Sequence, residues 1–125
     1  MAEMQFLSYS CAACPHAGQA ANHINRLLQQ RGVAEPRCAM GVALCTPEAV
    51  RDTLSGRPVM AIDACSYECV KRTLMRNGVT PAQHWRIDAY GLADDADGNF
   101  DTSLAAAVAT EISVEAEALL ARHFG

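Results

Sequence analysis

The spacing of apolar residues changes from strand-like to helix-like within one short stretch, residues 59–74, which read VMAIDACSYECVKRTL. Four consecutive apolar residues at 59–62 are typical of a buried strand, and Asp63 ends the run. Apolar residues then recur at helical spacing, at Tyr67, Val70 and Leu74. The stretch therefore predicts a buried strand that leads directly into a helix, which is the repeating unit of parallel α/β sheets.

Two cysteines, Cys65 and Cys69, lie at this junction between strand and helix. Ligands of open α/β sheets bind outside the carboxyl ends of the strands. The first amides of a helix have no partner within the helix, and the helix dipole favours an anion such as a thiolate. The junction is thus a candidate thiol site, and the positions of the other cysteines decide what it could bind.

Strands and helices alternate along the rest of the chain, which predicts right-handed crossovers and a mainly parallel sheet. We expect a three-layer α/β domain, Rossmann-like or flavodoxin-like, with about four strands in the order 2-1-3-4 and helices on both faces. The predicted strands are residues 4–9, 37–42, 59–62 and 85–90. The predicted helices are residues 19–30, 47–54, a segment from about 67 to the stop at Gly78, and a long helix capped by Ser103.

The length of 125 residues suits a single domain, 1–125. Residues 1–90 form the predicted α/β core with the cysteines, and residues 91–125 add a polar loop and the last helix. The loop from Asp94 to Asp101 does not have the spacing of a calcium-binding EF-hand. The last helix is rich in alanine, which suggests close packing over the sheet or a homodimer contact.

Charge and hydropathy exclude several classes of function. The formal net charge is −4, and no basic stripe is present to neutralise nucleic-acid phosphates. The sequence has no apolar run long enough for a transmembrane helix and no signal peptide at its N-terminus, so we expect a cytoplasmic protein. In a reducing cytoplasm, six cysteines indicate metal ligands or redox thiols rather than disulfides.

The positions of the cysteines favour a metal ion, most simply zinc, which binds four ligands in a tetrahedron and prefers thiolates. Cys11 and Cys14 form a C-x-x-C pair that can serve one metal from one loop. Cys65 and Cys69 are four residues apart and could do so from one helical face. Cys38 could contribute from a neighbouring strand. The strand order 2-1-3-4 would bring the Cys11 loop to face the Cys65 loop.

Residues 62–69, IDACSYEC, resemble the signature of the DGC-domain family of bacterial and archaeal proteins, which has Asp-Gly-Cys at this place. That family also has an early loop that opens with Cys and runs to Gly-Gln, as Cys11 to Gly18 and Gln19 do here. A further mid-chain cysteine matches Cys38. The resemblance covers residues 5–90 and implies a zinc site. Here Ala64 replaces the central glycine of the motif.

The predicted zinc ligands are Cys11, Cys38, Cys65 and Cys69. Cys14 has no counterpart in the family pattern and is a candidate substitute or exchange ligand. The biological role, as a carrier, sensor or accessory factor, stays open. Two alternatives also stay open: a thiol or dithiol redox enzyme that uses Cys11 and Cys14, and an iron–sulfur protein.

Other residues near the cysteines have less specific predictions. Cys45 is more typical of a buried core residue than of a ligand. Asp63 could accept amide hydrogen bonds from the turn that follows it, or could support the metal site. His16 could be a ligand or proton donor, although surface histidines are more common, and the sequence indicates no role for His84.

Overall fold

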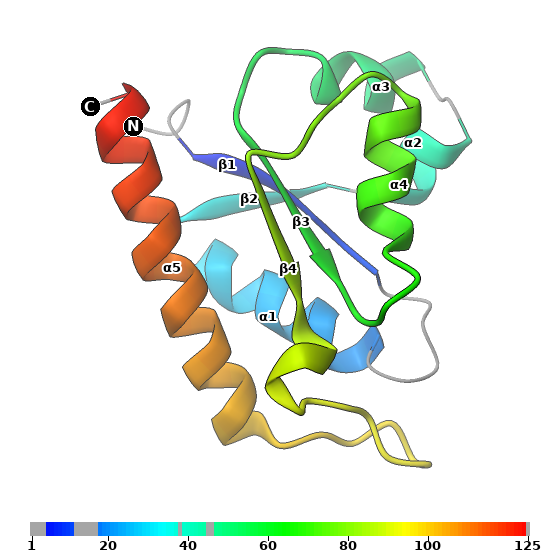
Figure 1. Ribbon diagram of the computed structural model, residues 1–125, viewed down its shortest axis with the longest axis vertical. Helices are drawn as coiled ribbons and strands as arrows, with labels where there is room; N and C mark the ends of the chain where they lie inside the picture. The colour runs from blue at the N-terminus through cyan, green and yellow to red at the C-terminus, as the bar shows by residue number, and fades with distance from the viewer. Residues whose placement is uncertain (1–4, 12–17, 38, 45–46, 125) are drawn as a thin grey trace.

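The computed structural model, which describes residues 5–11, 18–37, 39–44 and 47–124, has a four-stranded parallel sheet at its centre (Figure 1). The order β2-β1-β3-β4 confirms the predicted order. It places β1 and β3, the strands that precede Cys11 and Cys65, side by side. The strands are β1 (Phe6–Ser10), β2 (Ala34–Arg37), β3 (Val59–Asp63) and β4 (Gln83–Arg86).

Helices cover both faces of the sheet and complete the predicted three-layer α/β architecture. The helices are α1 (Gly18–Gln30), α2 (Ala39–Ala43), α3 (Pro47–Thr53), α4 (Cys69–Arg76), the 3₁₀ helix η2 (Ile87–Tyr90) and α5 (Thr102–Phe124). Helices α1 and α5 lie on one side of the sheet, and α2, α3 and α4 lie on the other. None of the helices that the structure describes has both the length and the apolar character needed to cross a membrane.

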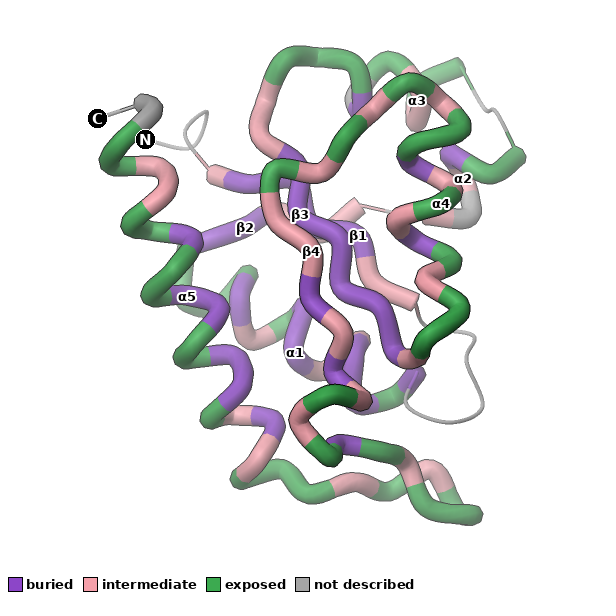
Figure 2. Tube along the Cα trace, in the orientation of Figure 1, coloured by how far each residue is buried: buried purple, intermediate pink, exposed green. Residues whose placement is uncertain are grey.

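The central strands divide their side chains between two apolar cores because successive residues of a strand point to opposite faces. Phe6 of β1 packs in the core beneath α1 and α5, whereas Leu7 and Tyr9 pack towards α4. All five residues of β3 are buried (Figure 2). The end of β3, and with it the start of the Cys65–Cys69 turn, therefore has a fixed position.

The second predicted strand, at residues 37–42, is wrong in its position. Strand β2 covers residues 34–37 and pairs with β1 from Phe6↔Ala34 to Tyr9↔Arg37. Pro36 is tolerated because β2 is an edge strand. The apolar run at 39–43 forms α2 instead, and its Val42 is buried in the core that contains α4.

The last predicted strand, at residues 85–90, is also shifted. Strand β4 ends at Arg86, which pairs with Asp63, the last residue of β3. Beyond this point β3 offers no backbone partner, so the chain turns into η2 at residues 87–90. Ile87 remains fully buried, which explains why the alternating apolar pattern continues past the strand.

The ends of two helices can be compared with the ends predicted from the sequence. Helix α1 ends at Gln30, the predicted helix end, and Gly32 follows two residues later: it has a φ of 73°, its amide donates to the Gln29 carbonyl, and the next amide, Val33, donates to the Leu28 carbonyl. The predicted cap at Ser103 is wrong, because α5 begins earlier, at Thr102. The Asp101 carboxylate accepts the Leu104 amide at 3.0 Å and caps the helix instead.

The acidic loop before α5 is tied to the start of α1. The Asp94 carboxylate accepts hydrogen bonds from the amides of Gln19 at 2.9 Å and Ala20 at 3.1 Å. Asp95 closes the loop by accepting the Asp97 and Asn99 amides, both at 2.9 Å. The loop therefore caps a helix that is distant in sequence, and this contact fastens the C-terminal segment to the α/β core.

We predict that Asp94→Ala lowers the free energy of unfolding by about 1 kcal/mol, since two amides at the start of α1 lose their acceptor. Urea denaturation followed by circular dichroism measures this change. Asp97→Ala is the matched control, because its exposed carboxylate accepts no hydrogen bond within the described residues. The control should shift stability by less than about 0.5 kcal/mol. Equal shifts in the two variants would contradict the capping role.

Candidate functional site

Cys11 follows β1 directly and lies against the end of β3. Its amide donates to the carbonyl of Ile62 at 3.2 Å. The half-buried side chain packs against both apolar cores. Because Ile62 is three residues before Cys65, the backbone of Cys11 lies beside the segment that begins the Cys65 turn.

A buried polar contact with α1 holds the end of β1 in place. Asn25 of α1 donates through Nδ2 to Ser10 Oγ at 3.1 Å and lies 3.5 Å from the Ser8 carbonyl. The Ser8 hydroxyl donates to Asn25 Oδ1 in turn. These bonds satisfy polar groups that would otherwise be buried without partners. They also fix the backbone immediately before Cys11.

Cys65 and Cys69 lie at the two ends of a tight turn rather than on one helical face. The Glu68 amide donates to the Cys65 carbonyl at 3.2 Å, and Glu68 adopts a left-handed conformation with φ 53° and ψ 44°. Helix α4 begins only at Cys69, so the predicted helical pairing of the two cysteines is wrong. Cys65 is half-buried and Cys69 is exposed.

The later start of α4 also changes the position of Tyr67. The sequence predicts Tyr67 as a packing residue of the helix. It lies instead in the turn before the helix, with 71% of its surface exposed. The Cys65–Cys69 turn thus presents an aromatic side chain to solvent.

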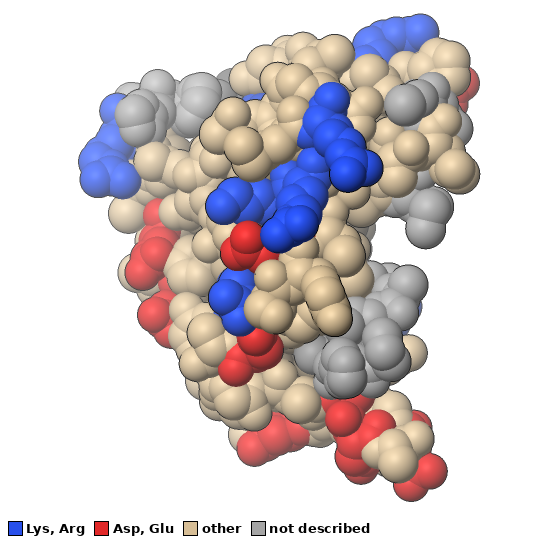
Figure 3. Space-filling view, turned by 45° about the vertical axis from the view of Figure 1, so that its right-hand side comes forward, with Lys and Arg blue, Asp and Glu red and all other residues tan. Residues whose placement is uncertain are grey.

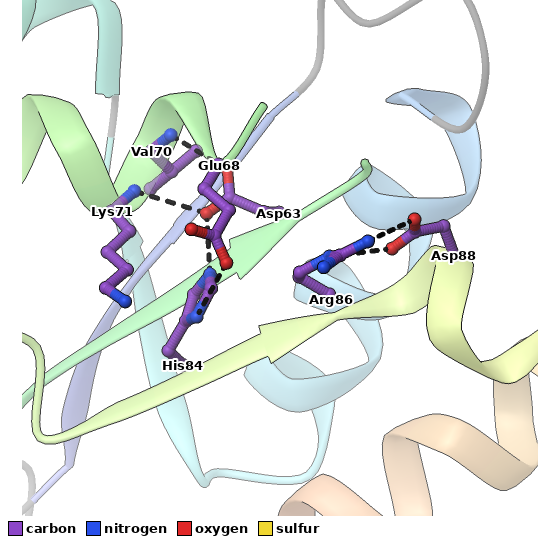
Figure 4. A network of polar contacts seen from close by, with 7 residues as sticks. All are labelled: Asp63, Glu68, Val70, Lys71, His84, Arg86 and Asp88. Atoms are coloured by element: carbon purple, nitrogen blue, oxygen red, sulfur yellow. Dashed lines mark hydrogen bonds and ion pairs between the residues drawn. The ribbon is translucent and has the colours of Figure 1, made fainter. Parts of the chain in front are cut away.

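The carboxylate of Asp63 organises this turn. It is buried, with 1% exposure, and accepts hydrogen bonds from the amides of Val70 at 2.8 Å and Lys71 at 3.2 Å (Figure 4). The predicted role of Asp63 as an amide acceptor is confirmed, with the first turn of α4 as the donor. The anion at this helix terminus is therefore a carboxylate, where the sequence suggested a thiolate.

His84 completes the network around Asp63, although the sequence indicates no role for it. Its Nε2 lies 2.8 Å from Asp63 Oδ2, and its Nδ1 lies 3.8 Å from Glu68 Oε2. His84 pairs with Ala61 across the sheet, so it shares a face with Asp63, two residues further along β3. The register between β3 and β4 is the signal that could have revealed it.

Arg86 brings positive charge to the same edge of the sheet. It forms a two-point ion pair with Asp88, with distances of 3.2 and 2.8 Å. This hydrogen bonding lowers the pKa of Asp88 and raises the pKa of Arg86. The negative charges of Glu68 and of the Cys65 thiolate also help to raise the pKa of Arg86. The guanidinium therefore places a positive charge within electrostatic range of Cys65.

Charges of opposite sign occupy different parts of the surface. Lysine and arginine side chains gather over α4, and acidic side chains lie along α5 and the loop before it (Figure 3). Helix α4 carries Lys71, Arg72 and Arg76, and it has no acidic residue. Cys69 is the first residue of this basic helix, and its thiol is exposed.

Three of the predicted ligands, Cys11, Cys65 and Cys69, lie within the described residues. Cys14 and Cys38 lie outside them, as do the other residues singled out by the sequence, Cys45 and His16. Within the described ranges, no three His, Cys, Asp or Glu side chains form a group suited to a metal ion. The complete ligand set therefore stays a prediction.

We predict that Asp63→Asn lowers the free energy of unfolding by about 2–3 kcal/mol, since hydrogen bonds to a buried charged acceptor are strong. Asparagine has one acceptor oxygen, and its amide group would face a backbone donor. Urea denaturation at neutral pH measures the change. Asp88→Asn, at a half-exposed ion pair of the same edge, should cost less than about 1 kcal/mol. Similar losses in both variants would contradict the central role of Asp63.

Comparison with known proteins gives one curated relative and no solved structure. The relative is the anaerobic and virulence modulator AnvM of Pseudomonas aeruginosa, which is 38% identical over 86 residues. The match covers 69% of this chain and 66% of the relative, so the chain spans slightly less than two thirds of that protein. No solved structure matches the chain.

The family comparison covers more of the sequence. The DGC domain matches residues 7–112, from the second residue of β1 to the middle of α5. This range includes the Cys11 loop, the Asp63-Ala64-Cys65 motif and the whole sheet except Phe6. It begins two residues later than the range 5–90 indicated by the motifs and extends further, to residue 112. The chain belongs to the DGC domain family.

Proposed function

We propose that the protein binds one zinc ion through the thiolates of Cys11, Cys38, Cys65 and Cys69, with Cys14 as a substitute or exchange ligand. The observation that supports this proposal best is the backbone hydrogen bond from Cys11 to Ile62. This bond joins the segment after β1 to the end of β3, immediately before the Cys65 turn. Two loops that carry thiols therefore start from the same edge of the sheet.

The chemistry of these residues suits zinc. Thiolates bind Zn²⁺ at about 2.3 Å and form closed tetrahedral sites. Arg86 brings a positive charge near Cys65, and metal binding requires the thiolate form of a cysteine ligand. Cys69 is exposed, so a metal bound there would be accessible to exchange with solvent ligands. Such access is expected of a carrier or sensor site more than of a purely structural one.

A dithiol enzyme receives less support from the same structure. Reactive cysteines usually have a low pKa because a helix terminus or a nearby cation stabilises the thiolate. At α4, Asp63 already accepts the Val70 and Lys71 amides. At α1, which follows the Cys11–Cys14 loop, Asp94 accepts the corresponding amides. Carboxylates therefore occupy these amides at both helix termini, which removes one of the two usual means of lowering a thiol pKa there.

The biological role we propose is that of a cytoplasmic regulatory or accessory protein. A reducing compartment keeps the thiols available for metal. The relative from Pseudomonas aeruginosa is named an anaerobic and virulence modulator, and a thiolate-bound metal is a suitable sensor for a process linked to oxygen. The predicted homodimer contact through α5 stays a prediction, as does the absence of nucleic-acid binding.

We predict that protein purified anaerobically contains about one equivalent of zinc by mass spectrometry. Cys65→Ser should lose the metal, because it removes a central ligand, whereas Cys14→Ser should retain it. Cys45→Ser, which changes a cysteine outside the proposed ligand set, is the matched control.

Two results would count against this proposal. Less than about a tenth of an equivalent of any metal in the wild-type protein would exclude a resident metal site. Visible absorption with iron in place of zinc would instead identify an iron–sulfur cluster on the same thiolates.

A further inference from the structure

We propose that His84 is a positioning residue for Cys65 and Cys69: it holds the Cys65–Cys69 turn in its metal-binding conformation through its hydrogen bond to Asp63. The proposal rests on the proposed metal function and adds a residue to that site. His84 lies on β4, outside the cysteine motifs, and its side chain faces one carboxylate on each side of Cys65.

The first contact of His84 is with Asp63, two residues before Cys65. The Asp63 carboxylate already accepts two backbone amides, so the imidazole Nε2–H donates the third hydrogen bond, at 2.8 Å. Asp63 is almost fully buried, and little water can reach it to replace a lost donor. Removing the imidazole would therefore weaken the acceptor on which the first turn of α4 depends.

The second contact is with Glu68, the residue before Cys69. Its carboxylate lies 3.8 Å from His84 Nδ1. Glu68 is the one non-glycine residue with a positive φ within the described ranges, and this conformation costs roughly 1–2 kcal/mol. Strained backbone of this kind persists where surrounding contacts hold it, and it is frequent at functional sites. Because this contact is an ion pair only with a protonated imidazole, the shorter hydrogen bond to Asp63 is the one that ties His84 to the turn.

Together the two contacts relate the thiol positions to the sheet. Cys65 follows Asp63 after one residue, and Cys69 is bonded directly to Glu68. The sheet register fixes the backbone of His84 opposite Ala61, and this places the imidazole beside Asp63 at the start of the turn. Metal sites lose about 10–100-fold in affinity when supporting residues of this kind are removed. We expect a loss in that range when His84 is truncated.

The test measures zinc affinity by competition with a chromogenic chelator in wild type, His84→Ala and His84→Gln. His84→Ala should weaken zinc binding about 10–100-fold. His84→Gln should recover most of the affinity, because its side-chain amide can donate to Asp63 as the imidazole does. His23→Ala is the matched control: this histidine lies on α1 and contacts Phe100, and its removal should change affinity by less than about twofold.

A second measurement uses the metal-free protein. Amide hydrogen exchange at Val70 and Lys71 should be faster in His84→Ala than in wild type, since both amides donate to Asp63. Alkylation of the exposed Cys69 thiol should also be faster in His84→Ala than in wild type. The His84→Gln variant should resemble wild type in both measurements.

The outcomes separate this proposal from the metal function. If wild type binds no metal, the metal function fails, and the exchange rates still decide whether His84 positions the turn. If wild type binds zinc and His84→Ala binds it equally well, the positioning role is overturned. Equal losses in His84→Ala and His84→Gln would also overturn it, because the cause would then be the missing ring rather than the missing donor.

Discussion

The buried carboxylate of Asp63 is the interaction on which the arrangement of the thiol turn depends. Asp63 is the last residue of β3. Its carboxylate accepts hydrogen bonds from two amides in the first turn of α4 and from the imidazole of His84 on β4. A buried carboxylate is stable only when its acceptor sites are filled. The turn that carries Cys65 and Cys69 is therefore fixed at its start by a polar contact, while Val70 and Leu74 fix the helix beyond it by apolar burial.

A carboxylate also accepts the first amides of α1, the helix that follows Cys11 in the sequence. Asp94 reaches the start of α1 from a loop 75 residues further along the chain. In both helices, amides of the first turn thus donate hydrogen bonds to a carboxylate that lies outside the helix. A free helix terminus would lower the pKa of a nearby thiol and make it reactive. Here the first amides of both helices already donate to carboxylates, so these amides are not available to stabilise a thiolate.

The parts of the fold set by local pattern could be predicted from the sequence. The strand order follows from the alternation of strands and helices along the chain, and the acceptor role of Asp63 follows from its place at the end of the apolar run at 59–62. The positions of β2 and β4 could not be predicted, because each is decided by its pairing partner. His84 was missed for the same reason: its partner lies 21 residues away and becomes visible only through the register of β3 and β4.

Ala64, which replaces the glycine of the family motif, is compatible with the turn for a specific reason. A glycine is required where φ is positive, and in this turn the positive φ falls at Glu68 rather than at Ala64. The Ala64 methyl group is buried, with 1% exposure, in the core that contains Ile62 and Trp85. Alanine also has less conformational freedom than glycine in the unfolded chain, which stabilises the folded state by about 0.4–1 kcal/mol. The substitution therefore stabilises the folded segment between Asp63 and Cys65 relative to the unfolded chain without adding strain.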